Sequence, residues 1–318
     1  METVIVAHGD CDGVTSAAIA YSVFGGRVVF SHPVGLLSDL EEFADQAERV
    51  VVLDISLDER TWKGVAEKLS AFKEAIYIDH HPPPEGGLEL LRKIGVKVFH
   101  EQGPSTAELA FRNLNPPREL SRVALYGAIG DYAVRTEWFN TYLGFWDIRA
   151  LYLEAGILTL GLEGLRRDHD RKRELVAELA GNRLPSSIDF LISSALREAK
   201  NLEEARRALP SKLVVLKSIA YVVHPGAPLG AMATFSHVQS GKPVGVAIEV
   251  KHDWAVMSLR SASGCVDLNV LLRELAPRYE GHGGGHREAA GARIPVARLE
   301  GFLAELDEAV SRVCSQQR

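Results

Sequence analysis

Short β-branched runs alternate with amphipathic stretches over residues 3–100, and this alternation constrains the fold more than any other feature of the chain. The runs that predict strands are 3–8, 27–30, 51–54, 75–79 and 96–100. The stretches between them that predict helices are 14–24, 37–50 and 58–72. A further helix is expected after Ser105, because Ser105 and Glu108 form a capping box. Such β–α–β repetition predicts an α/β domain with a parallel sheet and helices on both faces.

The rest of the chain has a different pattern. Strand signals disappear over 118–209, where apolar residues recur every three or four positions and predict helices. The later runs that predict strands are 212–223, 243–250 and 254–261, and the later predicted helices are 267–276 and 296–313. The expected parts are a catalytic domain over 1–140, a helical connector over 141–209 and a smaller α+β domain over 210–318.

The charge of the chain limits its partners. A formal net charge of −6 does not suit a protein that coats duplex DNA, but it is compatible with a short nucleic acid or a phosphorylated metabolite. The densest basic run, "RRDHDRKRE" at 166–174, is interleaved with acidic residues at helical spacing. We therefore predict an exposed helix face there rather than a track for phosphates.

Membrane and secretion signals are weak. No apolar stretch approaches the roughly 20 residues needed to cross a bilayer, and the nearest candidate, 211–223, contains two lysines. The first residues do not resemble a signal peptide, so we expect a cytoplasmic protein with no membrane partner.

The three cysteines, Cys11, Cys265 and Cys314, are widely spaced and form no CxxC pair. This pattern argues against a disulfide framework and against a thiolate zinc site. Cys11 stands between two acidic residues, and we predict that it is a small residue that points into the fold.

Acidic and imidazole side chains follow three of the predicted strands. Because the carboxyl ends of parallel strands meet at one edge of the sheet, residues that are distant in sequence can converge there. An aspartate after an apolar helical stretch, "YGAIGD", is a further candidate. These residues are His8, Asp10, Asp12, Asp54, Asp79, His80, His81 and Asp131.

Each of these residues also has an ordinary structural interpretation. An aspartate after a strand is commonly a helix cap or a turn residue, and a lone histidine such as His80 is commonly a hydrogen-bonded core residue. The coincidence of all of them favours metal binding, since clustered carboxylates repel one another and two divalent cations nearly balance five of them. A mixed histidine and aspartate set suits Mn²⁺, with Mg²⁺ as the alternative. A two-metal site activates water and stabilises a departing oxygen, so the expected reaction is phosphoester hydrolysis.

Other motifs fit this sequence less well. An EF-hand loop that starts at Asp10 would need Gly at its sixth position and Glu at its twelfth, and neither is present. A phosphoaspartyl phosphatase also begins with DxD after a strand, but it would not explain His8 or the Asp-His-His run. Neither a GxxxxGK[ST] loop nor a GxGxxG after the first strand occurs.

The glycine-rich stretch "EGHGGGHREAAGA" at 280–292 predicts a phosphate site in the second domain. Consecutive glycines let backbone amides approach an anion, and His286 can donate to a phosphate oxygen. The Ala-Ala-Gly that follows predicts a helix start, which would allow a close approach to the ligand. Arg260, at the end of a predicted strand, could add a planar clamp. A flexible surface turn is the alternative.

Together, "HGDCDGVTSA", "LD" at 53–54, "DHHPP" at 79–83, "GD" at 130–131 and "GGGHREAAG" resemble the DHH phosphoesterase superfamily with a C-terminal DHHA1 domain. The resemblance implies that one metal ion binds His8 and Asp10, that the other binds Asp12, His80 and Asp131, and that Asp54 bridges them. It also implies that Asp79 orients its neighbours and that His81 faces the scissile phosphate. The residues implied to bind substrate from the other domain are Arg260, Gly284, Gly285 and His286.

The superfamily includes RecJ-like exonucleases, oligoribonucleases, cyclic dinucleotide phosphodiesterases, pyrophosphatases and polyphosphatases. A DHHA1 domain favours the nucleotide-directed members, and the lack of an appended oligonucleotide-binding barrel favours short substrates. The leading hypothesis is therefore a Mn²⁺-dependent exonuclease that hydrolyses short single-stranded RNA or DNA to mononucleotides. The alternatives are hydrolysis of a small nucleotide, such as a cyclic dinucleotide or a phosphoadenosine nucleotide, and a non-catalytic scaffold with a protein partner in replication or repair.

Overall fold

The computed structural model describes residues 1–43, 46–261 and 264–315. The chain divides into two compact units, Met1–Arg197 and Glu198–Arg318. The boundaries that we expected at 140 and 209 stay predictions.

The described part of the first unit is built on a five-stranded parallel sheet in the order β2-β1-β3-β4-β5. Its strands are β1 (Thr3–His8), β2 (Arg27–Ser31), β3 (Arg49–Leu53), β4 (Glu74–Asp79) and β5 (Lys97–His100). The predicted α/β class with a parallel sheet is confirmed. Both faces of the sheet are apolar, which is why its strands are nearly continuous hydrophobic runs.

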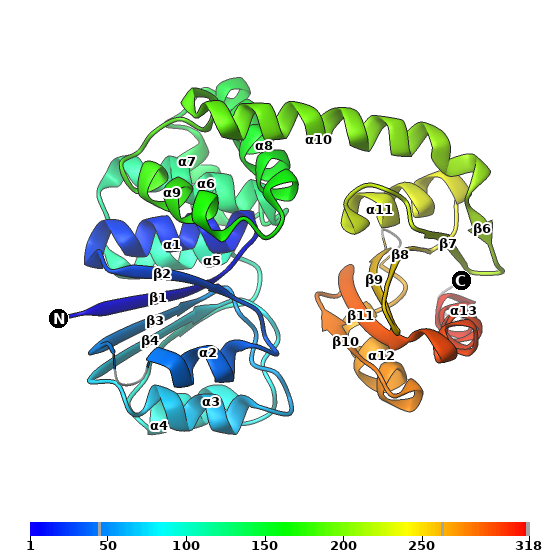
Figure 1. Ribbon diagram of the computed structural model, residues 1–318, viewed down its shortest axis with the longest axis horizontal. Coiled ribbons are helices and arrows are strands. Elements are labelled where there is room, and N and C mark those ends of the chain that lie inside the picture. The colour runs from blue at the N-terminus through cyan, green and yellow to red at the C-terminus, as the bar shows by residue number, and fades with distance from the viewer. Residues whose placement is uncertain (44–45, 262–263, 316–318) are drawn as a thin grey trace. The chain divides into compact units, whose positions relative to one another are not determined.

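Helices cover both faces of the first sheet (Figure 1), and alternate residues of a strand such as β1 pack against opposite layers. Ile5 and Ala7 of β1 pack in the core that contains α1 (Cys11–Phe24), α5 (Thr106–Leu114) and α6 (Ser121–Gly130). Val4 and Val6 pack in the core on the opposite face. The helices of that opposite layer are α2 (Leu36–Phe43), α3 (Trp62–Leu69) and α4 (Gly87–Lys93).

The strand order reverses at β1. The chain leaves β1 for β2 on one side and then returns to place β3 on the other side. Crossovers that diverge in this way leave a crevice between the carboxyl ends of the two central strands, and ligands of open α/β sheets bind there. The crevice of this sheet lies where β1 ends at His8 and where β3 ends before Asp54.

The stretch 118–209 is helical, as predicted. After α6 it contains α7 (Glu137–Leu143), α8 (Ile148–Leu165), α9 (His169–Ala180) and α10 (Asp189–Ala208). Buried leucines from three of these helices join the first core, namely Leu158, Leu175 and Leu191. Much of the expected connector therefore completes the hydrophobic core of the first unit.

The second unit has a mixed sheet in the order β10-β11-β9-β8-β7-β6, in which only the β7–β8 pair is parallel among the described residues. Its strands are β6 (Val214–Val215), β7 (Ile219–Val223), β8 (Val244–Lys251), β9 (Trp254–Ser261), β10 (His282–Gly285) and β11 (Ala289–Pro295). Its helices α12 (Leu268–Leu275) and α13 (Leu299–Ser315) share one core with the sheet, and α11 (Leu229–Ser240) packs in another.

Three predicted elements differ from those in the structure. Helix α1 begins at Cys11 rather than at 14, because Asp10 caps it by accepting from the Gly13 amide. The helix predicted over 37–50 ends at Phe43, and residues 44–45 lie outside the described residues. The run 212–223 contains two strands, β6 and β7, which pair as a hairpin.

The helix start predicted at Ala-Ala-Gly is wrong. Residues Ala289–Pro295 form β11, which pairs with β9 on one side and with β10 on the other. The alternating burial of this segment shows the physical reason, since Ala290, Ala292 and Ile294 enter the core at period two.

The cysteine prediction is also wrong in part. Cys265 and Cys314 are joined by a disulfide that links the segment before α12 to the end of α13. The two residues are 49 positions apart, and packing of α13 against the sheet brings them together. Cys11 is buried with 4% exposure, as predicted for a small residue that points into the fold.

Among the described residues, the structure has no helix that is both long enough and apolar enough to span a membrane.

Glycine allows a very close helix contact in the first unit. A Cβ atom at Gly127 of α6 would lie 2.4 Å from Thr15 Oγ1 of α1 and 2.6 Å from Ala107 Cβ of α5. A Cβ atom at Gly156 of α8, in contrast, would meet nothing within 4 Å. The first glycine is therefore required by packing, whereas the second is not.

We predict that Gly127→Ala lowers the free energy of unfolding by about 1–3 kcal/mol through overpacking. The matched control, Gly156→Ala, should leave the free energy unchanged or raise it by up to about 1 kcal/mol, because alanine favours the helix. Urea denaturation followed by circular dichroism measures both variants. Equal stability of the two variants would contradict the close contact between α6 and its neighbours.

Candidate metal centre

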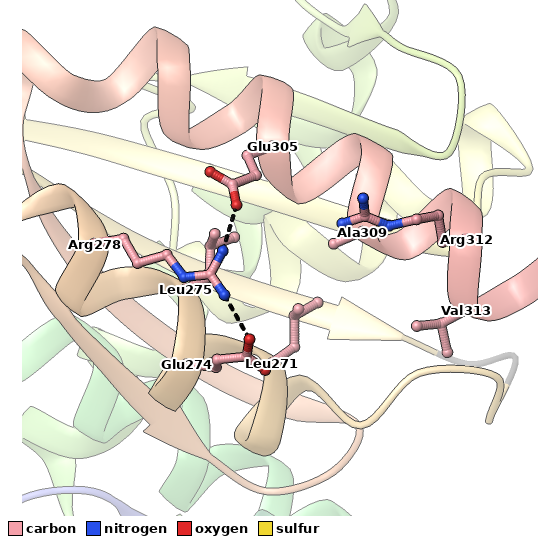
Figure 2. Close-up of a pocket in the computed structure, with 8 residues that line it drawn as sticks. All are labelled: Leu271, Glu274, Leu275, Arg278, Glu305, Ala309, Arg312 and Val313. Atoms are coloured by element: carbon pink, nitrogen blue, oxygen red, sulfur yellow. Dashed lines mark hydrogen bonds and ion pairs between the residues drawn. The ribbon is translucent and has the colours of Figure 1, made fainter.

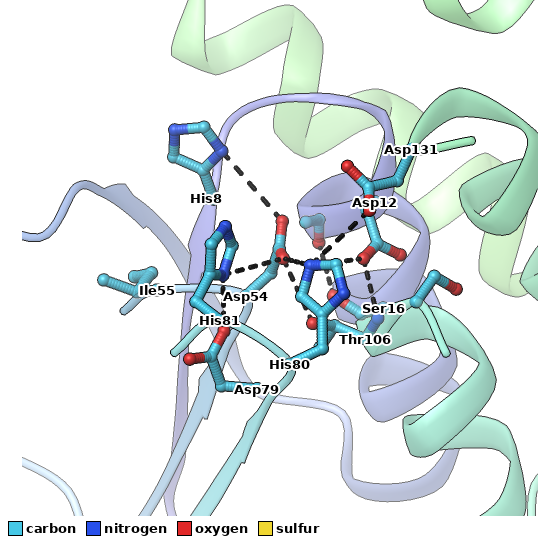
Figure 3. Close-up of polar contacts among 12 residues, drawn as sticks. His8, Asp12, Ser16, Asp54, Ile55, Asp79, His80, His81, Thr106 and Asp131 are labelled. Atoms are coloured by element: carbon cyan, nitrogen blue, oxygen red, sulfur yellow. Dashed lines mark hydrogen bonds and ion pairs between the residues drawn. The ribbon is translucent and has the colours of Figure 1, made fainter. Parts of the chain in front are cut away.

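The seven polar residues predicted at the strand ends and Asp131 converge at the carboxyl edge of the first sheet, and most of them are labelled in Figure 3. His8 ends β1, Asp10 caps α1, and Asp12 lies in the first turn of that helix. Asp54 follows β3, Asp79 ends β4, and His80 and His81 follow it. Asp131 caps the carboxyl end of α6.

Asp12 is held by the amino end of another helix. Its two carboxylate oxygens accept hydrogen bonds from the amides of Thr106 (2.7 Å) and Ala107 (2.9 Å), at the start of α5. These amides lie at the positive end of the helix dipole, which favours a carboxylate. The side chain is 2% exposed, so its position is fixed by backbone donors rather than by solvent.

Asp54 lies at the middle of the cluster in Figure 3 and is 3% exposed. Its φ of +59° is in the left-handed region, which aspartate tolerates better than most residues with a side chain. Its Oδ1 accepts a hydrogen bond from Thr106 Oγ1 at 3.1 Å and lies 3.5 Å from His80 Nε2. The backbone turn at Asp54 thus directs a buried carboxylate toward both Thr106 and His80.

His80 faces three carboxylates from a buried position. Its Nδ1 lies 2.8 Å from the Pro104 carbonyl oxygen, which can only accept, so Nδ1 carries a proton. The other nitrogen, Nε2, lies 3.5 to 3.9 Å from oxygens of Asp12, Asp54 and Asp131. A backbone acceptor on one ring nitrogen fixes the orientation in which the other nitrogen can bind a metal ion.

His8 and Asp10 form a second group at the end of β1. His8 Nδ1 lies 2.9 Å from Asp10 Oδ2 and 4.0 Å from Asp54 Oδ2. Both residues are more accessible than the rest of the cluster, with side-chain exposures of 39% and 53%.

Asp79 contacts His81, and ligand atoms of these two residues and of Asp54 lie within 4.8 Å of one another. Asp79 Oδ1 lies 2.8 Å from His81 Nδ1, and Asp79 Oδ2 accepts from the Tyr77 hydroxyl at 3.0 Å. Burial alone would raise the pKa of Asp79 and lower the pKa of His81. The contact between the two side chains outweighs burial, so the pKa of Asp79 is lowered and the pKa of His81 is raised. Their contact therefore favours a carboxylate on Asp79 and a proton on the His81 ring.

Asp12, Asp54 and Asp131 resist ionisation, whereas, although burial opposes it, His8 lowers the pKa of Asp10. Burial and the carboxylates of Asp12 and Asp10 raise the pKa of Asp54 well above its ordinary value. Burial and the same neighbours raise the pKa of Asp131 to about 7, and burial also raises the pKa of Asp12. Each upward shift reflects the cost of crowding negative charge in a site with little water.

The imidazoles have the opposite tendency. Asp10 raises the pKa of His8 to about 9. Although burial lowers it, contacts with Asp54 and Asp12 raise the pKa of His80 to about 11. Protons bound to the carboxylates and imidazoles thus offset the negative charge of the cluster. Divalent cations would displace these protons and offset the charge in their place.

The donor atoms fit two neighbouring cations that share one residue. The potential ligand atoms of Asp12, Asp54 and His80 lie within 4.8 Å of one another, and so do those of His8, Asp10 and Asp54. Asp54 belongs to both groups. Oxygen and imidazole ligands without thiolate suit Mn²⁺ or Mg²⁺, so the residues present fit the expected cofactor.

Several residues that build this centre were missed by the sequence prediction. Thr106 binds both Asp12 and Asp54, and its position directly after the Ser105 cap was the one available signal. His100 Nε2 lies 2.8 Å from the His81 carbonyl oxygen and comes from the end of β5. Lys172 of α9 donates to the Gly9 carbonyl, although its basic segment was predicted to be an exposed face.

In the second unit, the predicted substrate residues lie near one end of β9. Arg260 Nη1 donates to Ser258 Oγ at 2.8 Å, and a Cβ atom at Gly230 of α11 would lie 2.7 Å from Arg260 Nη2. The register pairs Arg260 with Ala289, the first residue of β11. Arg260 is therefore next to the turn that contains His286.

Gly284 and Gly285 lie on β10, beside α12. The Gly285 amide donates to Asn269 Oδ1 at 3.1 Å, and the φ of Gly285 is +142°, which favours glycine. The His286 amide donates to the Ala289 carbonyl and closes the hairpin turn. The glycines thus occur in a hairpin rather than before a helix.

A separate hollow of about 180 Å³ lies between α12 and α13 (Figure 2). Arg278 crosses it and pairs with Glu274 and Glu305. Of the residues that the structure describes, none of the four predicted to bind substrate lines this hollow, so it does not belong to the predicted site.

The sequence matches two family models in succession. Residues 2–130 match the N-terminal domain of the DHH family, and residues 215–312 match the DHHA1 domain. A comparison with curated protein sequences found no match.

Solved structures with this fold include three phosphoesterases. RecJ from Thermus thermophilus in complex with Mn²⁺ has a TM-score of 0.69 at 19% identity, over 98% of this chain and 52% of that chain. The chain therefore spans about half the length of that RecJ. An exonuclease RecJ bound to manganese has a TM-score of 0.64 at 20% identity, over 98% and 90% of the two chains. PggH, a pGpG-specific phosphodiesterase from Vibrio cholerae, has a TM-score of 0.60 at 12% identity, over 98% and 99%.

At these low identities, the TM-scores show a shared fold alone. The family models show that the sequences are also related. The two models follow each other in the order of the two units and together cover most of the chain. The chain belongs to the DHH phosphoesterase superfamily and carries a DHHA1 domain on the C-terminal side of its DHH domain.

Proposed function

We propose that this protein is a Mn²⁺-dependent phosphodiesterase that removes mononucleotides from an end of short single-stranded RNA or DNA. The observation that carries the proposal is the position of Asp54, whose carboxylate belongs to two adjacent groups of metal-ligand atoms. A two-cation site of this kind is typical of enzymes that catalyse in-line displacement at phosphorus.

The distances support the ligand assignment that the family resemblance implies. His8 and Asp10 would hold one ion, and Asp54 would bridge to the other. The ligands proposed for the second ion besides Asp54 are Asp12, His80 and Asp131. When bound, the two cations would activate water and neutralise charge on the phosphate and on the departing oxygen.

His81 and Asp79 have a different role in the proposal. Asp79 holds His81 Nδ1 and favours the protonated ring. A protonated imidazole that is fixed in orientation can donate to a phosphate oxygen and stabilise the negative charge that develops there. We therefore assign His81 to contact the scissile phosphate and Asp79 to orient His81.

The second unit is proposed to bind the substrate. Arg260 supplies a planar guanidinium that suits phosphate oxygens. Gly284 and Gly285 bring backbone close to the Asn269 side chain, and His286 follows them in the hairpin turn. These four residues are the proposed substrate contacts.

Two classes of substrate are candidates, an oligonucleotide and a small nucleotide. Two of the structural relatives are named as RecJ and one as a phosphodiesterase specific for pGpG, which supports a substrate that contains nucleotides. Hydrolysis of a small nucleotide is the second candidate, since this chain and PggH cover each other almost completely. The convergence of potential ligand atoms within 4.8 Å of one another favours a catalytic protein over a non-catalytic scaffold.

We predict that Asp54→Asn abolishes Mn²⁺-dependent hydrolysis, with a rate loss of more than about 100-fold, because the bridging carboxylate is removed. Asparagine tolerates the left-handed φ of this position as well as aspartate does. Because burial and neighbouring carboxylates raise the pKa of Asp54, its ionisation opposes folding at neutral pH, so the variant without metal should melt at a higher temperature than the wild type. Thermal melting with and without Mn²⁺ measures this, and the variant should lose the Mn²⁺-induced rise.

Cys11→Ala is the control for this experiment. Cys11 is buried between two proposed ligands, but its sulfur contacts the Tyr126 carbonyl instead of the cluster. The variant should retain activity and Mn²⁺ binding. Full activity of Asp54→Asn would contradict the proposed site.

Purified protein with Mn²⁺ and an oligonucleotide labelled at either end should release mononucleotides from one end. We predict faster cleavage of oligomers of two to five nucleotides than of long ones, for RNA, DNA or both. A cyclic dinucleotide and a phosphoadenosine nucleotide are tested in parallel. Cleavage of these small nucleotides alone would favour the second candidate, and no cleavage of any substrate would contradict a phosphodiesterase.

We predict that Arg260→Ala raises the KM for the oligonucleotide by about 10-fold or more, as expected when a charged hydrogen bond is lost. Mn²⁺ binding should be unchanged, because Arg260 lies outside the metal cluster. Steady-state kinetics and calorimetric titration with Mn²⁺ separate the two effects. An unchanged KM would remove Arg260 from the proposed substrate contacts.

A further inference from the structure

Lys172 is a buried lysine on a helix that is otherwise charged and exposed. Its relative exposure is 6%, and it shares the buried face of α9 with Leu175, Val176 and Leu179. The neighbouring Arg171 and Arg173 are exposed and pair with acidic residues of the same helix. Lysine is rarely buried to this extent unless its ammonium has a partner, so the contact made by Lys172 requires an explanation.

The partner of Lys172 is the backbone between two proposed metal ligands. Its Nζ donates to the carbonyl oxygen of Gly9 at 2.5 Å, across 163 residues of sequence. Gly9 separates His8 from Asp10 and connects the end of β1 to the start of α1. A hydrogen bond to this carbonyl fixes the peptide that sets the directions of both ligand side chains.

The surroundings of Gly9 leave little room for this peptide to move. A Cβ atom at Gly9 would lie 3.2 Å from Lys172 Nζ and 4.0 Å from Phe30 Cβ of β2. The loop therefore lies between α9 and the neighbouring strand. His8 and Asp10 are the least buried members of the cluster, and their printed side-chain contacts are with each other, with Asp54 and with the Gly13 amide.

We propose that Lys172 is a positioning residue for the metal ion held by His8 and Asp10, acting through the Gly9 carbonyl. This inference rests on the proposed metal site. Lys172 does not itself bind the ion, since an ammonium has no lone pair to donate. Its function is to hold the loop so that the His8 ring and the Asp10 carboxylate are in place before the ion arrives.

Positioning and electrostatics predict opposite effects of removing the charge. A nearby positive charge repels a divalent cation, so its loss would tighten Mn²⁺ binding if Lys172 acted through charge alone. Loss of a positioning contact weakens metal binding, typically by 10- to 100-fold for groups that support ligands from outside the coordination sphere. The sign of the change therefore distinguishes the two roles.

The test compares Lys172→Met with Arg173→Met in the full chain by calorimetric titration with Mn²⁺. Methionine keeps the apolar stem of lysine in the core, so we expect Lys172→Met to fold. Lys172→Met should bind one of the two ions about 10-fold or more weakly, and the Mn²⁺ concentration needed for half-maximal activity should rise by a similar factor. Arg173→Met, on the exposed face of the same helix, should match the wild type.

A second variant perturbs the same contact from the other side. Gly9→Ala places a methyl group against the flexible end of Lys172 and does not require a left-handed backbone. Gly9→Ala should also weaken Mn²⁺ binding. If Lys172→Met does not fold, the Mn²⁺ affinity of Gly9→Ala tests the proposal in its place. Circular dichroism of the metal-free proteins establishes that each variant is folded.

The outcomes separate this inference from the proposed function. If the wild type binds no Mn²⁺, the proposed metal site is wrong. If the wild type binds two ions and Lys172→Met binds them equally well or more tightly, the positioning role is overturned. Lower stability of folded Lys172→Met with unchanged Mn²⁺ affinity would likewise overturn it, because it would show a purely structural contact.

Discussion

Repulsion among buried carboxylates is the constraint on which the arrangement of the first unit depends. Asp12, Asp54 and Asp131 lie around His80 Nε2, and burial raises the pKa of each carboxylate. Without restraint from the fold, such carboxylates would move apart or take up protons. The fold opposes separation with fixed donors, chiefly the amino end of α5, which binds both oxygens of Asp12. The fold itself thus holds the carboxylates together, and the cost appears as shifted protonation.

Close packing of helices makes this arrangement compact. A Cβ atom at Gly13 would lie 2.1 Å from the His8 carbonyl oxygen, so α1 starts directly against the end of β1. Gly127 brings α6 against α1, where a Cβ atom would also lie 2.8 Å from Asp12 Oδ1. Small residues therefore determine how near Asp131 comes to Asp12, although they contribute no chemistry themselves. The proposed metal ligands and the core packing thus depend on the same helices.

The sequence was sufficient to predict features that depend on local pattern. Strand periodicity located the ends at His8, Asp54 and Asp79, and the rule that parallel strands share one edge predicted their convergence. The reversal of strand order at β1 and the contact of Lys172 with Gly9 depend on tertiary packing, which no local pattern records. The hairpin at Ala289 was mistaken for a helix because alanine and glycine carry little periodic signal until their neighbours in β9 and β10 are known. The Cys265–Cys314 disulfide was missed for a similar reason, since spacing alone does not reveal proximity.

Asp54 shows why the cluster is better explained by function than by folding. Its backbone is left-handed, its carboxylate is buried, and neighbouring charges oppose its ionisation. Asparagine would satisfy the same backbone conformation and could still accept from Thr106 Oγ1, without the charge. For the stability of the metal-free fold, aspartate is therefore the poorer choice at this position. Aspartate adds a negative charge that lies between two groups of potential ligands, and this charge would stabilise bound cations.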